Sequence, residues 1–348
     1  MRISPIIFGC KGTRLTDEEK AFYRAVQPWG FILFSRNVET PEQVTALIAE
    51  MRSCVEHEDV GILVDQEGGR VRRLRPPHWA EYHSARVIGS HYQQSKGRGK
   101  RIAWLQSRLM AFDMVKLGIN VDCLPVLDVP VPGAHDVIGD RAYGSDVSSI
   151  SEMGRDAAQG MLDGGVLPVI KHIPGHGRSM VDSHLDLPRV DTDLETLKKT
   201  DFEPFRRLAD MPVAMTAHVI YDAIDKQAPA TTSKTVINAI IRDYIGFDGL
   251  LMCDDLSMQA LSGDFSERVQ SSFAAGCDVV LHCNGEMEEM RQVADALPEF
   301  GDKAYQRVLN ATAYWSSTSS DDEEELREEF ERLCQSSDYE HDPTEAHL

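Results

Sequence analysis

The run VLPVIKH at residues 166–172 opens with five apolar residues and ends in a lysine and a histidine. An almost continuous apolar run of this length is typical of a strand that is buried on both faces of a parallel sheet. Seven more runs of this kind occur along the chain: PIIFGC (5–10), GFILFS (30–35), GILVDQ (61–66), NVDCLPVLDV (120–129), PVAMTAHVI (212–220), GLLMCDD (249–255) and CDVVLHC (277–283). We therefore expect eight buried strands.

Longer amphipathic stretches separate these runs. The apolar residues of TPEQVTALIAEMRSC (40–54) recur at helical spacing, and Thr40 is a suitable N-cap. Similar stretches occupy residues 148–165, 193–209 and 232–246. Alternating strands and helices over about 300 residues predict a (β/α)8 barrel, a TIM-like α/β fold, as a single catalytic domain over residues 1–315. A doubly wound sheet is the competing fold, but no G-x-G-x-x-G follows the first strand.

The composition of the 348 residues, 42% hydrophobic and 26% charged, is that of a folded globular protein. The net charge of −20 disfavours nucleic acid and anionic membranes as partners. The seven cysteines include no C-x-x-C pair, which is typical of buried thiols in a reducing compartment. No signal peptide or membrane span is recognised, so we expect a cytoplasmic protein. We expect a monomer, with an oligomer left open.

Residues 316–348 differ from the rest of the chain, because they hold 12 acidic residues and only two arginines. Ser320 and Glu323 form a possible capping box, which predicts a charged helix that ends near Cys334. We expect this acidic tail to be partly helical or disordered and solvated. A segment that binds a partner is the alternative.

Polar residues at the carboxyl ends of barrel strands face the active site. Here these ends carry ionisable side chains, which are costly to bury unless they are paired or used. The residues concerned are Asp65, Asp128, Lys171, His172, His218, Asp254, Asp255 and His282. Together they indicate an active site, although any one of them alone is equally well explained as a residue that caps a loop.

The segment VDQEGGRVRRLRP (64–76) joins a strand end to a Gly-Gly turn and a group of arginines. The glycines allow close approach of the backbone to a ligand. Asp65 is placed to accept sugar hydroxyls, while Arg73 reaches across. A turn followed by a solvated basic patch is the ordinary alternative.

The segment KHIPGHGRSMVDSH (171–184) leaves the fifth strand in a loop that cannot be regular structure. Asp182 and His184 are two residues apart, so the carboxylate can orient the imidazole and favour its protonated form. His172, His176 and His184 could instead bind a metal, but their spacing matches no recognised ligand pattern.

The segment GLLMCDDLSM (249–258) places Asp254 at the end of the seventh strand. A carboxylate that faces a protonated acid is the pair that a retaining glycosidase needs, one group attacking and one protonating the leaving oxygen. A metal site built on Asp254 and Asp255 is the alternative, and no other carboxylate-rich motif completes it.

These three segments together resemble glycoside hydrolase family 3, and within it the single-domain bacterial β-N-acetylhexosaminidases of the NagZ type. The resemblance extends from about Pro5 to about residue 300, and the K-H-x-P-G-H-G-x(4)-D-S-H and D-D-L-S-M motifs are highly specific. It implies that Asp254 is the nucleophile and that His184 is the acid/base, with Asp182 as its partner. It also implies sugar binding by a further set of residues: Asp65, Arg73, Arg141, Lys171 and His172.

The resemblance implies hydrolysis of terminal β-linked N-acetylglucosamine through a covalent glycosyl-Asp254 intermediate, without cofactor or metal. It further implies a role in peptidoglycan recycling, with N-acetylglucosaminyl-1,6-anhydro-muramyl peptides as substrates. A phosphorylase that uses the same site is the nearest alternative, and a metal-dependent barrel hydrolase is a more distant one. The acidic tail has no counterpart in the family pattern.

Overall fold

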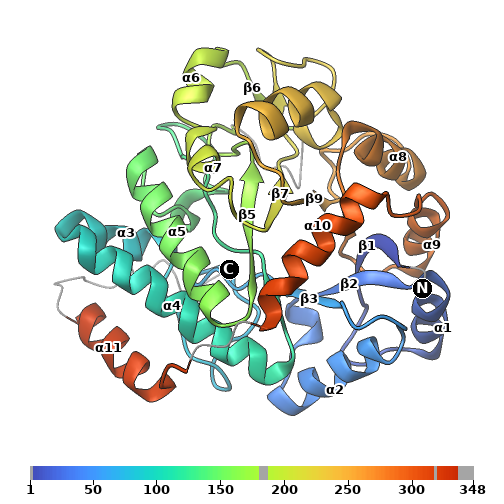
Figure 1. Ribbon diagram of the computed structural model, residues 1–348, viewed down its shortest axis with the longest axis horizontal. Helices are drawn as coiled ribbons and strands as arrows, with labels where there is room; N and C mark the ends of the chain where they lie inside the picture. The colour runs from blue at the N-terminus through green and yellow to red at the C-terminus, as the bar shows by residue number, and fades with distance from the viewer. Residues whose placement is uncertain (1–2, 180–186, 317–319, 336–348) are drawn as a thin grey trace.

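The computed structural model describes residues 3–179, 187–316 and 320–335, and it confirms the predicted (β/α)8 barrel (Figure 1). Eight parallel strands close into a barrel in the order in which they occur in the chain. The strands are β1 (Ser4–Gly9), β2 (Pro28–Leu33), β3 (Gly61–Val64), β4 (Val121–Asp122), β5 (Leu167–Ile173), β7 (Val213–Thr216), β9 (Leu250–Asp255) and β10 (Val279–His282). A separate two-stranded pair, β6 (Arg189–Val190) and β8 (Ile220–Tyr221), lies outside the barrel.

Helices surround the barrel (Figure 1). They are α1 (Asp17–Val26), α2 (Pro41–Arg52), α3 (Ala85–Gln94), α4 (Lys96–Leu117), α5 (Val147–Asp163), α6 (Leu194–Lys199), α7 (Glu203–Arg207), η4 (Val236–Tyr244), α8 (Phe265–Ala275), α9 (Met287–Asp295), α10 (Asp302–Thr312) and α11 (Glu323–Gln335). Short 3₁₀ turns add η1 (Ser35–Asn37), η2 (Gly139–Arg141), η3 (Ala230–Thr232) and η5 (Ala313–Ser316). Among the described residues, no helix is both long and apolar enough to cross a membrane.

The barrel strands are buried on both faces, as their continuous apolar runs predict. The run at residues 120–129 differs from the expectation, because only Val121 and Asp122 form a strand. Pro125 has no N–H to donate to a ladder, so regular pairing stops before it. The chain beyond it stays close to β5, where the Leu127 N–H donates to the Lys171 carbonyl at 2.7 Å. This path carries Asp128 to the same end of the barrel as His172.

Two of the predicted helices are less regular than their periodicity suggests. The stretch 193–209 forms two short helices, α6 and α7, because Pro204 lacks an N–H and is accommodated only in the first turn of a new helix. The stretch 232–246 forms η4, which is a π-helix. The N-cap predicted at Thr40 is confirmed, since its side chain accepts from the Gln43 N–H at 3.2 Å.

The last two helices take different positions. Figure 1 shows α10 running across the front of the barrel, while α11 lies beside α4 at the edge of the molecule. Four of the six glutamates of α11 are exposed, whereas its Phe330 is only 7% exposed and belongs to the core. Asp322 accepts from the N–H groups of Glu324 and Glu325 at the start of the helix, at 2.9 and 3.3 Å.

Candidate active site

A cavity of about 200 Å³ opens at the carboxyl end of the barrel strands. Of the residues that the family resemblance assigns to the nucleophile, the acid/base and sugar binding, all those that the structure describes line it: Asp65, Arg73, Arg141, Lys171, His172 and Asp254. These residues come from four different segments of the chain, which the closed barrel brings together. Asp182 and His184 lie outside the described residues.

The carboxylate of Asp65, at the end of β3, pairs with two positively charged side chains. One oxygen of its carboxylate accepts from the Lys171 ammonium at 2.8 Å, and the other accepts from the Arg73 guanidinium at 3.1 Å. Its side chain keeps 15% of its surface exposed toward the cavity, so it remains reachable by a ligand. This is the arrangement expected of a carboxylate that accepts hydroxyl hydrogen bonds while fixed by its neighbours.

Glu67 is a second carboxylate in this network, and it was not among the site residues predicted from the sequence. It accepts both nitrogen donors of the Arg141 fork at 2.8 Å each, and it lies 2.7 Å from the Lys171 ammonium. The sequence feature that could have identified Glu67 is its position two residues after Asp65, because side chains two residues apart in an extended segment point to the same side.

The pKa values of these groups follow from burial and from the surrounding charges. Burial acts to raise the pKa of Asp65, but Lys171 and Arg73 outweigh it and hold the pKa well below its usual range. For Glu67, Arg141 and Lys171 likewise outweigh burial and lower the pKa from 4.5 to about 2. Burial acts to lower the pKa of Lys171, and the two carboxylates reverse it, so that the pKa is raised. All three groups are therefore charged at neutral pH.

His172 is oriented from behind by Asp128. The imidazole Nδ1 lies 2.7 Å from one oxygen of the buried carboxylate, and the other oxygen accepts from the His176 N–H at 2.6 Å. Burial acts to raise the pKa of Asp128, but the neighbouring histidines lower it below its usual value. Burial lowers the pKa of His176 to about 4, with His172 acting in the same direction. A neutral His176 therefore lies beside His172, whose Nδ1 is already hydrogen-bonded to Asp128.

The two aspartates that end β9 are placed differently. Asp254 lines the cavity, and its carboxylate accepts from the N–H of Asp255 at 2.8 Å. The side chain of Asp255 accepts from the N–H groups of Ser257 and Cys283, at 3.0 and 3.1 Å. Asp255 therefore holds the loop after β9 to the end of β10, and both aspartates line the cavity.

The loop after β3 is held together by one buried glutamine. The Gln66 side chain accepts from the N–H groups of Arg73 and Leu74, at 2.9 and 3.0 Å, and donates to the Leu74 carbonyl at 3.0 Å. Between these contacts Gly68 and Gly69 adopt positive φ angles of 88° and 56°, a conformation that glycine adopts readily. The loop therefore returns Arg73 to the carboxylate of Asp65.

Two predicted strand-end histidines do not line this cavity. His218 is bound by the Thr231 hydroxyl at 2.7 Å and by the Asp255 carbonyl at 3.1 Å. His282 lies 3.1 Å from the Glu289 carboxylate. Both are completely buried, so their contacts are structural. Within the described segments, no cluster of three or more His, Cys, Asp or Glu side chains is suited to hold a metal ion.

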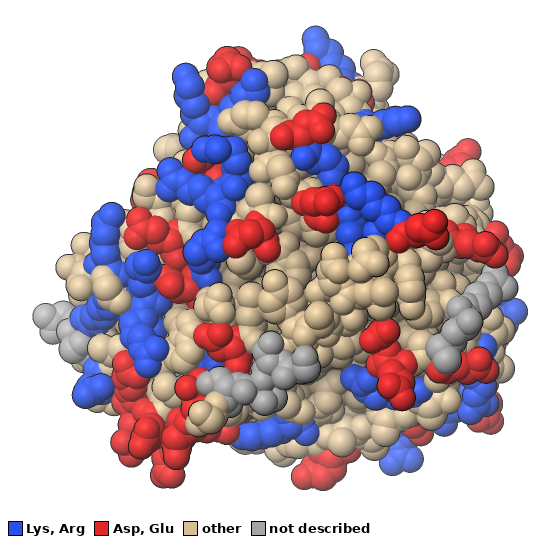
Figure 2. All heavy atoms as spheres, in the orientation of Figure 1, with Lys and Arg blue, Asp and Glu red and all other residues tan. Residues whose placement is uncertain are grey.

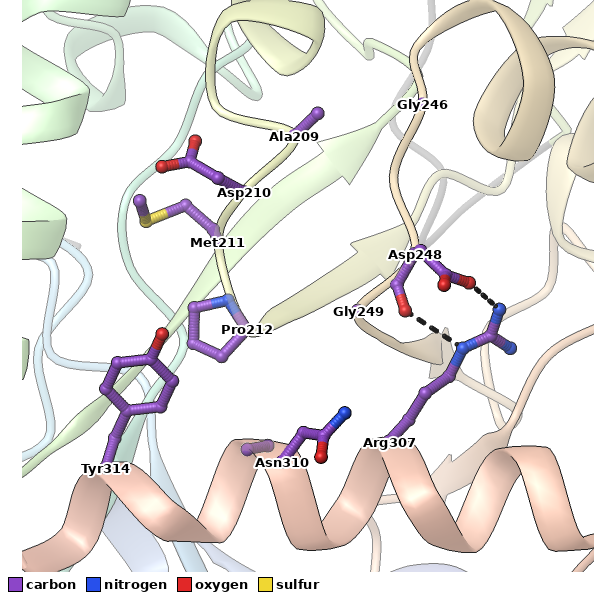
Figure 3. Close-up of a pocket in the computed structure, with 11 residues that line it drawn as sticks. Ala209, Asp210, Met211, Pro212, Gly246, Asp248, Gly249, Arg307, Asn310 and Tyr314 are labelled. Carbon is purple, nitrogen blue, oxygen red and sulfur yellow. Dashed lines mark hydrogen bonds and ion pairs between the residues drawn. The ribbon is translucent and has the colours of Figure 1, made fainter.

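A second cavity, of about 290 Å³, lies at the opposite end of the barrel, below β7 and β9. Figure 3 shows Arg307 of α10 turned toward Asp248 at its edge. The other lining carboxylate, Asp210, is paired with Arg155 at 2.8 Å. Both carboxylates are therefore already neutralised by arginines, and this end of a barrel supports the fold rather than catalysis.

Comparison with known families gives one extensive match. A family model described as "Glycosyl hydrolase family 3 N terminal domain" matches residues 10–312. A protein named beta-hexosaminidase from Alkalilimnicola ehrlichii is 38% identical over 82% of this chain and 82% of its own length. One with the same name from Idiomarina loihiensis is 37% identical over 88% and 92%.

Solved structures show the same similarity. Native NagZ from Neisseria gonorrhoeae superposes with a TM-score of 0.83 at 30% identity, covering 96% of each chain. The same protein has been solved in complex with N-trifluoroacetyl-D-glucosamine. A family 3 β-N-acetylglucosaminidase from a Paenibacillus strain superposes with a TM-score of 0.85 at 29% identity, over 94% of this chain and 66% of that one.

Proposed function

The chain belongs to glycosyl hydrolase family 3 and is a glycosidase, and from that premise we propose that it releases terminal β-linked N-acetylglucosamine with retention of configuration. One observation carries the proposal: Asp254 lines the same cavity as Asp65 and Lys171, two members of a charged network to which Glu67 is tied through Lys171. A sugar held by that network lies next to a carboxylate that ends a barrel strand. The similarity to proteins named beta-hexosaminidase supports the choice of sugar.

The reaction proceeds in two steps. In the first, a carboxylate oxygen of Asp254 forms a bond to the anomeric carbon, the glycosidic bond breaks, and the imidazolium of His184 gives its proton to the leaving oxygen. In the second, His184 removes a proton from water, which attacks the anomeric carbon and releases Asp254. The roles of His184 and Asp182 rest on the family resemblance alone.

The charged network binds and orients the sugar. Because neighbouring cations hold the pKa of Asp65 low, its carboxylate stays ionised and accepts hydroxyl hydrogen bonds. Lys171, Arg73, Arg141 and His172 supply donors around the same cavity. A histidine acid also suits this site, because it avoids a second negative charge close to Asp254.

We further propose that the natural substrates are N-acetylglucosaminyl-1,6-anhydro-muramyl peptides and that the enzyme works in the cytoplasm, in peptidoglycan recycling. This finer assignment is supported by the family resemblance and by the likeness to NagZ. All seven cysteines are free thiols, which is in keeping with a reducing compartment.

The test compares an aryl β-N-acetylglucosaminide with the matching β-glucoside, each with and without phosphate. We expect release of free β-N-acetylglucosamine as the first product from the first substrate only, unaffected by phosphate. A sugar-1-phosphate product would establish a phosphorylase instead, and loss of activity with a chelator would establish a metal-dependent hydrolase. Equal cleavage of the glucoside would overturn the choice of sugar.

A further inference from the structure

The acidic helix α11 lies on a basic helix. α4 carries six Lys or Arg residues and one Asp, whereas α11 carries six Glu and two Arg. Arg101 donates two hydrogen bonds to Glu329, at 2.9 and 2.6 Å, and Lys116 lies 2.6 Å from Glu323. Figure 2 shows acidic side chains gathered at the lower left, where Figure 1 places α11, beside basic side chains.

Three further contacts show that α11 packs against the rest of the domain through specific interactions and not only through overall charge attraction. Arg108, whose side chain is 3% exposed, pairs with Asp321 at 3.1 Å just before the helix. Arg98 donates to the Leu333 carbonyl at 2.9 Å in the last turn, where a helix prefers a cation. Phe330, which is 7% exposed, packs against the ring of His83 with centroids 5.9 Å apart. Both ends and the middle of the helix are thus held.

Besides α4, helix α11 contacts the segment 82–84, which precedes α3. The Tyr82 hydroxyl donates to Asp113 at 2.7 Å, and Arg327 lies 4.0 Å from the other oxygen of that carboxylate. The backbone of His83 is clamped by Gln106, which accepts from its N–H and donates to its carbonyl, at 2.9 Å each. Contacts from α11 therefore reach a segment that is already fixed to α4.

The other side of that segment supports the Gly68–Gly69 turn. The Gly69 N–H donates to the Tyr82 carbonyl at 2.9 Å. A Cβ built at Gly68 would lie 2.2 Å from the His83 carbonyl oxygen, and one at Gly69 would lie 2.6 Å from the Ser84 Cβ. The turn and the segment are thus in close contact with no spare space.

This turn lies within the loop that carries the sugar-binding network. Asp65 and Glu67 come just before it and Arg73 shortly after it, and all three depend on the loop for their positions. We infer that α11 is a brace for the substrate-binding loop, acting through the segment 82–84 and the Gly68–Gly69 turn. Arg327 and Phe330 are positioning residues: they set how well the loop holds the sugar and take no part in the chemical steps. The inference rests on the proposed function for the identity of that sugar.

The experiment uses the full-length chain and two matched double variants of α11. Arg327→Ala with Phe330→Ala removes the contacts to Asp113 and His83. Glu331→Ala with Arg332→Ala changes an equal number of side chains on the exposed face of the same helix. Amide hydrogen exchange is measured over residues 66–84, with β9 as the marker of an intact barrel, together with the Kd for N-acetylglucosamine and the kinetics on the aryl β-N-acetylglucosaminide.

In the first variant we expect about tenfold faster exchange over 66–84, unchanged protection of β9, and a roughly tenfold rise in KM and Kd, with kcat within twofold. The exposed-face variant should behave as wild type. Unchanged exchange over 66–84 in the first variant would overturn the inference, as would faster exchange with unaltered sugar affinity. A wild type that neither binds nor cleaves the sugar would overturn the proposed function, and the exchange data would still decide whether α11 supports the loop.

Discussion

Both donors of the Arg141 fork end on one carboxylate, that of Glu67, at 2.8 Å each, and neither Arg141 nor Glu67 belongs to a barrel strand. Arg141 comes from η2 and Glu67 from the loop after β3, so this ion pair joins two loops above the barrel. Lys171, from β5, completes the contact at 2.7 Å from the same carboxylate. The pair therefore fixes the relative positions of three segments that surround the proposed sugar site.

Glu67→Gln should weaken both the fold and sugar binding. Glutamine retains one acceptor oxygen but leaves Lys171 and Arg141 short of a buried negative charge, at a cost of about 3 kcal/mol in the free energy of unfolding. Asp210→Asn, which breaks an ion pair on the surface, should cost less than about 1 kcal/mol. Urea unfolding of the two variants measures the difference, and equal losses would show that Glu67 does not hold the network.

The kinetic effect of Glu67→Gln should fall on substrate affinity. Misplacing one charge-assisted donor is worth roughly tenfold. We therefore expect KM for an aryl β-N-acetylglucosaminide to rise about tenfold with kcat nearly preserved. A fall in kcat at constant KM would instead place Glu67 among the groups that act in the transition state.

The stability contributed by Glu67 should depend on pH in a defined window. Its pKa falls from 4.5 to about 2 in the folded protein because Arg141 and Lys171 outweigh burial, so between these values the unfolded chain binds more protons than the folded one. The contribution is complete above about pH 5 and is lost as the pH falls toward 2. The stability gap between wild type and Glu67→Gln should therefore narrow from pH 6 to pH 3.5, measured by urea unfolding. A gap that widens in acid would contradict the assigned pKa direction.

The barrel was predictable because its signal is local and repeated. Each apolar run, such as residues 166–172, is long enough to be recognised alone, and eight of them leave few alternatives. The irregular pieces were not predictable in the same way. Pro125 shortens β4 and Pro204 divides a helix, because neither proline has an N–H to donate. The spacing of the apolar residues continues across both prolines, so it does not predict these interruptions.

The site was predicted less completely than the fold. Some site residues can be recognised from the sequence because they are ionisable residues at the ends of apolar strands, namely Asp65, Lys171 and Asp254. Glu67 does not, because it lies in a polar loop where a solvated glutamate is the ordinary explanation. Its role depends on contacts with residues 74 and 104 positions away in the chain, which only the folded barrel creates. The packing of α11 against α4 could not be predicted for the same reason, because the partners of Arg101 and Arg108 lie more than 200 residues away in the chain.

Asp254→Asn should retain the fold and sugar binding while losing turnover by about four orders of magnitude. A 2-deoxy-2-fluoro glycoside should label the wild type on the peptide 251–258, at Asp254. Asp255→Asn is the matched control: its amide oxygen can still accept from the Ser257 and Cys283 N–H groups, but it loses the negative charge and the second oxygen, which accepts from the Ser257 hydroxyl, so it should be less stable but still labelled at Asp254. Labelling of Asp255 or Asp65 would overturn the assignment of the nucleophile.

The role proposed for His184 predicts a dependence on the leaving group. An aryl oxide of low pKa departs with little help, whereas a sugar hydroxyl needs the proton that His184 supplies. His184→Ala should therefore reduce cleavage of a β-N-acetylglucosaminyl disaccharide far more than the first step on an activated aryl substrate. Its second step should remain slow, because the same residue activates water.

This imbalance should make the glycosyl-enzyme accumulate in His184→Ala. Rapid mixing with an activated aryl substrate should show a burst of aryl product followed by slow turnover, and azide should speed the slow phase by attacking the anomeric carbon without needing a base. Asp182→Ala should show a weaker form of both effects, because it orients and charges the imidazole rather than transferring the proton. Equal losses on both substrates, with no burst and no rescue by azide, would mean that His184 only binds the sugar and that the acid lies elsewhere.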